Sequence, residues 1–310
     1  MNGTRILLLC SNHFALQTMQ ELAFFQQLAA VVIPSHCDEW IEHASLVLQS
    51  TQVPIISVDK VHFAEQLNEA FKTYQANLGL IVSFSFKLPA SIIQIPVLGF
   101  FNVHPAPLPA YRGADPVFYQ IKNQESRSGV SIHVVDTGWD TGPLVMRELI
   151  PLLPSDTYGL LSIKLSLLAA RLVQNLVKLI GFGLPLPLRA QDSSKASYHA
   201  RQGAREVSIL WDHMSALQVI ALINACNPWN KGASTRFGNQ IIRFLEARVS
   251  AQPHKAEPGS VIKFDQSFIL VACKDQQTME VSVVSTDAGI FSAARLSEIG
   301  IVPGMKFESI

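Results

Sequence analysis

Asn102 and His104 lie two positions apart in the apolar segment Phe-Phe-Asn-Val-His, which begins at Phe100. If this segment is a strand, residues two apart project from the same face, so the carboxamide and the imidazole lie side by side. Prolines at alternate positions from 105 to 109 prevent the strand from continuing. The pair therefore offers a neutral hydrogen-bond donor beside a group that titrates near neutral pH.

A second polar cluster, Val-Val-Asp-Thr-Gly-Trp-Asp-Thr-Gly, follows the apolar stretch 130–135. It supplies the carboxylates Asp136 and Asp140, and its glycines at 138 and 142 allow a tight loop that can approach a ligand closely. Each cluster alone also fits a plainer interpretation, namely a structural histidine or an ordinary Asp-Gly turn.

Together the two clusters hold the groups that transfer of an acyl-level carbon to an amine requires. An amide N–H stabilises the developing oxyanion, and an imidazole takes the proton that the amine loses. A carboxylate orients that imidazole and stabilises its charged form. The combination favours a catalytic interpretation over two unrelated structural features.

The N-terminal half alternates short apolar runs with amphipathic stretches, which predicts an α/β domain with a mostly parallel, Rossmann-like sheet covered on both faces. In such sheets ligands bind at the carboxyl ends of the strands, where the Asn102 pair is expected. The predicted strands are 5–10, 28–34, 53–58, 78–84, 100–104, 130–135 and 144–150, and the predicted helices 14–25, 63–75 and 158–181.

The polar, pattern-free stretch near 189–205 is typical of a linker. Beyond it we expect a helix over 208–225, followed by several short strands separated by turn formers, which is typical of a small open β-barrel of OB-like type. The predicted organisation is a catalytic domain over 1–190, a linker over 191–206 and a barrel domain over 207–310.

Composition excludes several function classes. With 48% apolar and 15% charged residues the chain is globular, and 24 basic residues balance 24 acidic ones, so no global field attracts a polyanion. The four cysteines form no CxxC pair, which predicts no metal site and a reducing cytoplasm. No dinucleotide fingerprint or P-loop follows a strand. The apolar stretch 160–188 is interrupted by three cations, so we expect a core helix and no membrane span.

The segment Asn-Val-His-Pro-x-x-Leu-Pro-x-Tyr-Arg-Gly, with Asp-x-Gly-x-Asp-Thr-Gly downstream, resembles the 10-formyltetrahydrofolate-dependent formyltransferases. The resemblance implies 10-formyltetrahydrofolate as the formyl donor, and catalysis by Asn102, His104 and Asp140, the Asp that precedes Thr-Gly. It also implies a folate pocket made largely of backbone, although Phe86 equally fits core packing. The implied folate contacts are Ser85, Phe86, Leu88, Ala106, Pro107, Leu108, Pro109, Val135, Asp136 and Gly138.

Motifs outside the two loops resemble the methionyl-tRNA formyltransferases within this family: Ala-Ser-Tyr at 196–198, Trp-Asp at 211–212, Asn-Pro-Trp at 227–229 and Val-Pro-Gly at 302–304. Those enzymes typically carry a basic, glycine-rich insertion after the second strand. The equivalent region here, 34–52, holds three acidic and no basic residues. Since basic side chains supply most nucleic-acid affinity, this departure makes tRNA a disfavoured partner.

We therefore expect an acceptor amine that is not borne on tRNA, such as an amino sugar, an amino acid derivative or a carrier-bound aminoacyl group. A divergent methionyl-tRNA formyltransferase is the first alternative. A hydrolase that releases formate from the same folate is the second. It is less expected because such enzymes usually carry a domain ahead of the catalytic one, and none precedes residues 1–10.

Overall fold

The computed structural model describes residues 3–250 and 252–310, which form two compact units. The first comprises the residues up to Gly113, Ser128–Ile150 and Ser162–His199. The second comprises Ala114–Arg127, Pro151–Leu161 and Ala200–Ile310. Residues 191–199 of the predicted linker thus fall in the first unit, while the predicted domain limits themselves stay a prediction.

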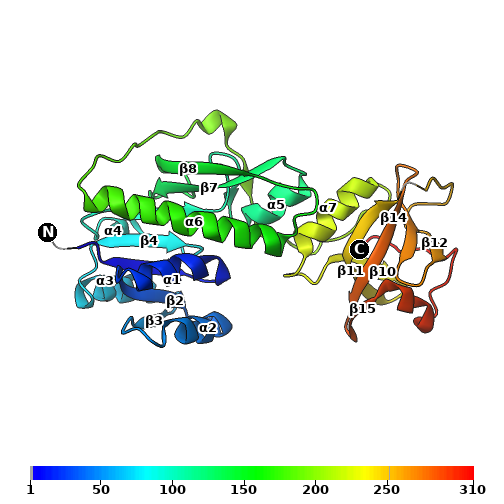
Figure 1. Ribbon diagram of the computed structural model, residues 1–310, viewed down its shortest axis with the longest axis horizontal. Coiled ribbons are helices and arrows are strands. Elements are labelled where there is room, and N and C mark those ends of the chain that lie inside the picture. Colours follow the sequence, from blue (N-terminus) through cyan, green and yellow to red (C-terminus); the bar gives the residue numbers. More distant parts are fainter. Residues whose placement is uncertain (1–2, 251) are drawn as a thin grey trace. The chain divides into compact units, whose positions relative to one another are not determined.

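The first unit is built on a seven-stranded sheet with the order β3-β2-β1-β4-β5-β7-β8 (Figure 1). Pairing is parallel from β3 to β5, whereas β7 runs antiparallel to β5. The predicted mostly parallel α/β domain is confirmed. The strands are β1 (Ile6–Cys10), β2 (Leu28–Pro34), β3 (Ile55–Val58), β4 (Leu78–Val82), β5 (Phe100–His104), β7 (Arg127–Val134) and β8 (Leu144–Pro151).

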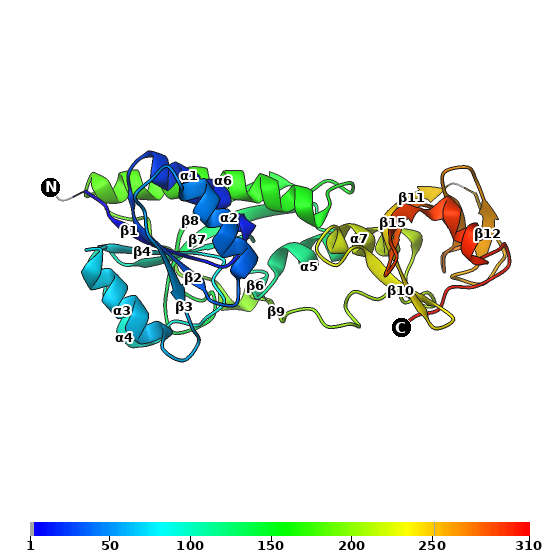
Figure 2. The same ribbon diagram turned by 90° about the horizontal axis from the view of Figure 1, so that it is seen from below.

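Helices cover both faces of this sheet, with α1, α2 and α6 on one side and α3 and α4 on the other (Figure 2). Every residue of β1 and β2 is buried, as a sheet covered on both faces requires. The helices are α1 (Leu16–Phe24), preceded by a 3-10 turn at His13–Ala15, α2 (Asp38–Leu48), α3 (Phe63–Thr73), α4 (Ala90–Ile93) and α6 (Tyr158–Gly181).

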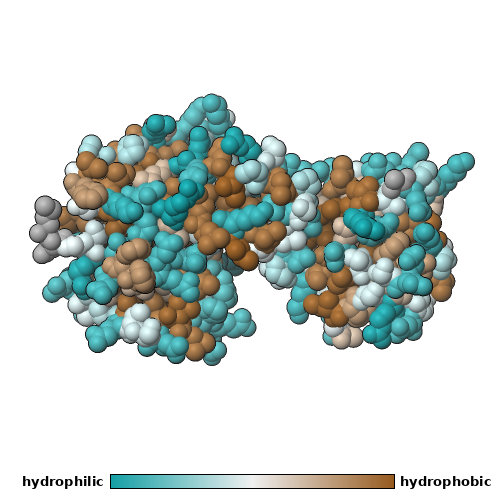
Figure 3. Space-filling view, viewed as in Figure 1, coloured by the Kyte–Doolittle hydropathy of each residue, from teal (hydrophilic) through white to brown (hydrophobic). Residues whose placement is uncertain are grey.

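Helix α6 is long and apolar enough to cross a membrane, but 56% of its most apolar window is buried, as in the core helix of a globular domain. Its outer side still exposes apolar residues, including Ile163 and Leu167, and apolar side chains over this helix are visible in Figure 3.

Helix α2 was not expected from the sequence. Its buried residues Trp40, Ala44 and Leu48 recur every four positions and form the apolar stripe that docks it. Asp38 and Glu39 occupy its first turn, where negative charge stabilises the helix. The acidic segment 34–52 is therefore largely an ordered helix with a negative N-terminus.

The second unit holds an antiparallel sheet with the order β10-β11-β14-β13-β12, and β15 pairs with β14. The residues at 306 and 308 form isolated bridges to Ser260 and Arg236, one beside β12 and the other in β10, so the C-terminal segment reaches both edges. The elements are α5 (Pro116–Lys122), α7 (Ala216–Cys226), β10 (Ala233–Phe237), β11 (Gln240–Ser250), β12 (Val261–Phe264), β13 (Ile269–Ala272), β14 (Thr278–Thr286), β15 (Gly289–Ser292) and a 3-10 helix at Ala293–Ile299.

The predicted helix over 208–225 is wrong in its first half, because α7 begins only at Ala216. Ser215 caps α7 by accepting from the Gln218 N–H, and the Gln218 side chain accepts from the Ser215 N–H. This reciprocal capping box defines the helix start more strongly than the apolar pattern upstream of it.

Candidate active site

Strand β5 carries both Asn102 and His104, so the predicted same-face pairing holds for the backbone. In the sheet Asn102 lies between Ile81 of β4 and His133 of β7. Asn102 is half-buried, whereas His104 and His133 are only 4% and 2% exposed. The polar side chains thus cluster around β5, in the interior of a largely apolar sheet.

Asp140 joins this pair through its two carboxylate oxygens. Oδ1 accepts a hydrogen bond from Asn102 Nδ2 at 3.0 Å, and Oδ2 accepts from the Gly113 N–H at 2.9 Å. His104 Nδ1 lies 3.7 Å from Oδ1, and the Asp140 side chain is 9% exposed. The three residues expected from the sequence therefore form one contiguous, shielded cluster.

The loop that carries Asp140 reaches this cluster by an unexpected path. We expected it to begin beside the carboxyl end of β5, but β7 is antiparallel to β5, and the Val135 N–H donates to Phe100 at the opposite end of that strand. A left-handed backbone at Asp140 (φ 56°) turns the chain back. A Cβ on Gly142 would overlap the Val134 carbonyl, so glycine is required where the loop closes.

Asp136, the other carboxylate of the loop, has a different environment. Its Oδ1 accepts from the Gly138 N–H at 3.0 Å and from the Thr141 hydroxyl at 2.6 Å. These bonds close the loop on itself and contact none of the other polar groups of the cluster. The geometry therefore separates a loop-stabilising Asp136 from Asp140, which faces the imidazole.

His104 is held in one tautomer. Its Nε2 lies 2.7 Å from the Tyr111 carbonyl oxygen, and because a carbonyl only accepts, Nε2 carries the proton. Nδ1 of the neutral ring is then free to accept a proton, on the side facing Asp140. Burial lowers the pKa of His104, and His133 and Arg112 lower it further, while Asp140 and the bond to Tyr111 partly oppose this. His104 is consequently neutral near pH 7 and available as a base.

Asp140 is the negative partner of this base. Burial by itself raises the pKa of Asp140, but the nearby His104 ring in its protonated form and the hydrogen bond from the Gly113 N–H oppose burial, and the net effect holds the pKa well below its usual range. The carboxylate therefore stays ionised across the physiological range and stabilises a protonated imidazole 3.7 Å away.

His133 is a member of the cluster that the sequence analysis missed. Its Nδ1 lies 2.9 Å from the Val134 carbonyl oxygen, which places the proton on Nδ1, and its Nε2 accepts from Asn102 Nδ2 at 3.0 Å. Both N–H groups of Asn102 are thereby engaged, one by His133 and one by Asp140. Donation to a substrate oxygen requires one of these bonds to be exchanged. Only the β5–β7 register reveals this, since in the sequence His133 is flanked by the apolar residues Ile132 and Val134.

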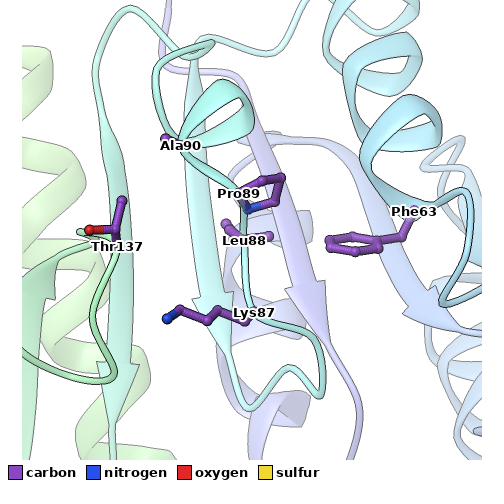
Figure 4. Close-up of a pocket in the computed structure, with 6 residues that line it drawn as sticks. All are labelled: Phe63, Lys87, Leu88, Pro89, Ala90 and Thr137. Carbon is purple, nitrogen blue, oxygen red and sulfur yellow. The ribbon is translucent and has the colours of Figure 1, made fainter.

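The residues expected to contact folate fall into three groups. The first group is Ser85, Phe86 and Leu88, and it adjoins in sequence an open hollow of about 380 Å³, shown in Figure 4, whose lining is Phe63, Lys87, Leu88, Pro89, Ala90 and Thr137. Leu88 is in this lining, and Thr137 lies between Asp136 and Gly138. Phe86 instead packs against Phe63 and Phe84, with ring centroids 5.2 and 5.4 Å apart. Ser85 has its amide and hydroxyl 3.1 Å from Ser11 Oγ.

The second group, 106–109, is the proline loop after β5. The side chains of Ala106 and Leu108 are fully buried, while Pro107 and Pro109 are half-buried. The Ser131 hydroxyl donates to the Ala106 carbonyl at 2.7 Å and accepts from the Leu108 N–H at 3.1 Å, which fixes the loop. The third group, Val135, Asp136 and Gly138, lies in the aspartate loop, with Val135 packed against the core and Gly138 exposed.

Within residues 3–250 and 252–310, no group of three or more His, Cys, Asp or Glu side chains is arranged to hold a metal ion. The chemistry available at the cluster is that of an amide donor, a neutral imidazole and a carboxylate.

Comparison with known proteins agrees with this site. Residues 26–175 match the family model described as "Formyl transferase", and residues 204–294 match "Formyl transferase, C-terminal domain". Methionyl-tRNA formyltransferase of Kosmotoga olearia is 31% identical over 72% of this chain and 70% of its own. The Legionella pneumophila (strain Philadelphia 1) protein of that name is 28% identical over 78% of this chain and 76% of its own.

Solved structures with 15–16% identity share the fold. The N-formyltransferase from Helicobacter canadensis, in complex with folinic acid and dTDP-3-aminofucose, has a TM-score of 0.68 and covers 90% of this chain and 99% of its own. HypX from Aquifex aeolicus in complex with tetrahydrofolic acid has a TM-score of 0.66, over 95% of this chain and 47% of its own. The chain belongs to the formyl transferase family and is a formyltetrahydrofolate-dependent formyltransferase.

Proposed function

We propose that this chain transfers the formyl group of 10-formyltetrahydrofolate to a primary amine that is not borne on tRNA, with Asn102, His104 and Asp140 as its catalytic residues. The observation that carries the catalytic part is the state of His104. Its Nε2–H is fixed by the Tyr111 carbonyl, and its unprotonated Nδ1 faces a carboxylate whose pKa is held below its usual range. A neutral base with a built-in counter-charge is what amine acylation requires.

In the proposed reaction the amine nitrogen attacks the formyl carbon, and the carbonyl π electrons move to oxygen. Asn102 exchanges one of its two hydrogen bonds to donate to this oxyanion. His104 Nδ1 takes the proton that the amine nitrogen loses, and Asp140 stabilises the imidazolium. The C–N10 bond then breaks, N10 receives the proton from His104, and the products are the formamide and tetrahydrofolate.

We assign the donor to the loops 85–90, 106–109 and 135–140. Leu88 of the first loop and Thr137 of the last line the same hollow, which supports this assignment. The backbone of the loop 106–109 is held in place by its two hydrogen bonds with Ser131. Backbone groups held in place can recognise a flat heterocycle by hydrogen bonding without rearrangement. The buried side chains of Ala106 and Leu108 leave the backbone as the contacting part of that loop.

The acceptor proposal rests on charge. No lysine or arginine occurs between Arg5 and Lys60, and helix α2, in the region of the basic insertion of the tRNA enzymes, begins with two acidic residues. A surface that binds an acceptor stem needs several basic contacts to phosphate. Methionyl-tRNA is nevertheless the second candidate, because the relatives that match about three quarters of the chain carry that name.

The two acceptors are separated by supplying 10-formyltetrahydrofolate with methionyl-tRNA, nucleotide-linked amino sugars or free amino acid derivatives, and measuring tetrahydrofolate release. We expect a small amine to accelerate release and the acceptor KM to change little between 50 and 200 mM salt. A tRNA acceptor would instead be preferred over the small amines and lose affinity steeply over this range, by about 10³-fold or more for six or more phosphate contacts. That pattern would overturn the acceptor proposal and leave the transfer chemistry intact.

The pH dependence tests the state of His104. The neutral ring is the active form and burial lowers its pKa, so kcat should be constant at neutral pH. It should fall only when the pH drops through a value below about 6.5, the ordinary imidazole pKa. The measurement is kcat at saturating donor and acceptor from pH 4.5 to 8. An acid limb above pH 7 would contradict a buried, neutral His104.

We further propose that the second unit is an open, OB-like β-barrel, supported by the bridges from the C-terminal segment to both β10 and the start of β12. We also propose the domain limits 1–190, 191–206 and 207–310, because the chain changes across this linker from strands in a mostly parallel sheet to short antiparallel strands. A cytoplasmic location is proposed from the sequence, in which the four cysteines lie far apart and form no CxxC pair.

A further inference from the structure

A strap formed by residues 189–199 runs along the candidate active site of the first unit. At its start the backbone of Arg189 pairs with Leu144 of β8, through hydrogen bonds of 2.8 and 2.9 Å. At its end Tyr198 and His199 (β9) pair in parallel with Arg112 and Gly113 (β6). The strap is therefore fastened at both ends to segments that carry or adjoin the catalytic groups.

Gln191 is the residue of the strap that contacts the aspartate loop. Its Nε2 donates to the carbonyl oxygens of Asp140 and Gly142, at 2.8 and 2.7 Å. These carbonyls flank the left-handed turn at Asp140, whose φ of 56° is costly for a residue with a Cβ and persists only where the surroundings enforce it. Two hydrogen bonds from one amide supply that enforcement.

The other end of the Gln191 amide holds Arg112. Gln191 Oε1 accepts from Arg112 Nη2 at 2.7 Å and from Nε at 3.2 Å. The guanidinium, in a residue only 3% exposed, also donates to the Tyr198 hydroxyl at 2.6 Å and lies over its ring. One side chain thus connects the Asp140 loop to the Tyr-Arg-Gly segment.

The same strap holds Tyr111, whose carbonyl fixes the tautomer of His104. The Tyr111 N–H donates to Ser197 Oγ at 2.8 Å, and its ring stacks on His199 with centroids 5.0 Å apart. Tyr111 also has a left-handed backbone, with φ 62°. Asp140 and Tyr111, which both face His104 from outside β5, are therefore strained positions secured by the strap.

We propose that Gln191 is a positioning residue that holds the Asp140 carboxylate and the Arg112 segment in register around His104. This inference rests on the proposed catalytic role of His104. Gln191 touches neither the imidazole nor the proposed reacting atoms, so it acts on the rate only through the geometry of Asp140 and Tyr111. A displacement of about 1 Å at such a site costs on the order of 100-fold in rate.

The test replaces Gln191 with Met, which is similar in length and lacks the amide. We expect kcat to fall about 30- to 100-fold, with the KM for 10-formyltetrahydrofolate changed less than about twofold. The acid limb of the kcat profile should move to lower pH, because Asp140 raises the pKa of His104 and its displacement removes that effect. A general loss of folding lowers activity equally at all pH values and leaves the limb in place.

A second variant guards against misfolding. Gln191→Glu keeps the oxygen that accepts from Arg112, so the strap stays anchored. It loses both N–H donors to the Asp140 and Gly142 carbonyls, so kcat should still fall at least about tenfold. Ser194→Ala is the matched control on the strap, since within the described part of the chain Ser194 bonds Asp192 of its own turn and no residue of the site, and its kcat should equal that of the parent protein.

The proposal is overturned if the kcat of Gln191→Met is within about threefold of the parent value. It is also overturned if kcat and folate affinity both fall while the acid limb stays at the same pH. His104→Ala, measured in parallel, distinguishes this failure from failure of the proposed function. Full turnover by that variant would refute the catalytic assignment itself, whatever the Gln191 variants do.

Discussion

Replacing Asn102 with Asp is expected to abolish useful turnover, with kcat reduced by about 10²–10³-fold or more, the loss typical of removing an oxyanion donor. The substitution changes one atom's identity, from the Nδ2 donor to an acceptor oxygen. It removes the N–H proposed to stabilise the oxyanion, and it brings a second negative charge to within about 3 Å of Asp140 Oδ1, the distance Nδ2 occupies now.

Stability gives an independent readout of this variant. Repulsion between the two carboxylates raises the folded-state pKa of the new Asp above its unfolded value. The free energy of unfolding is then lower than that of the parent protein above this pKa, and the deficit shrinks as the pH falls through it. The measurement is Tm at pH 5 and pH 8, together with kcat.

Asn77→Asp, the same exchange just before β4 at the other end of the strands, is the control expected to keep kcat. Near-normal turnover by Asn102→Asp would refute the oxyanion role.

Replacing His104 with Ala is expected to lower kcat by about 10²–10⁴-fold, the usual worth of a positioned general base. Folate binding should persist, because the proposed donor loops are held by Ser131 and by the Asp136 turn, neither of which uses the imidazole. The variant should also lack the acid limb of the parent protein, since the titrating group is gone. The measurements are kcat across pH and the Kd of a non-transferable folate.

His104→Gln is the matched variant, because a glutamine amide can donate to the Tyr111 carbonyl but cannot take a proton. It should fold as well as the parent protein and be as slow as His104→Ala. If Gln restored the rate, hydrogen bonding and not proton transfer would explain His104, and the base assignment would be wrong.

The parts of the fold that the sequence predicted are those set by local pattern. Buried parallel strands such as β1 and β2 appear as unbroken apolar runs, and the alternation on β5 placed Asn102 and His104 together. The Asn102–His104 cluster and the Asp140 cluster each also fit an ordinary structural role. They predicted one catalytic site because an amide donor, an imidazole and a carboxylate together supply the groups that formyl transfer needs.

What the sequence did not reveal depends on pairing between distant segments. The direction of β7, and with it the partnership of His133 and Asn102, is a matter of sheet register, which leaves no mark within β7 itself. The strap was predicted only as a linker because its order comes from the bonds of Gln191 to Asp140 and Gly142, 51 and 49 residues earlier, and not from any apolar period. The start of α7 was misplaced for the opposite reason, since a local capping box prevailed over the apolar pattern upstream.

In the proposed reaction the formyl carbon passes directly from the folate to an amine at the His104 cluster. The most direct measurement is a single turnover with 10-[¹³C]formyltetrahydrofolate, followed by NMR with and without a primary amine acceptor. We expect the label to appear as a formamide, one per tetrahydrofolate released, only when the amine is present and His104 is intact. Label appearing as free formate at the same rate with or without the amine would contradict it and identify a hydrolase.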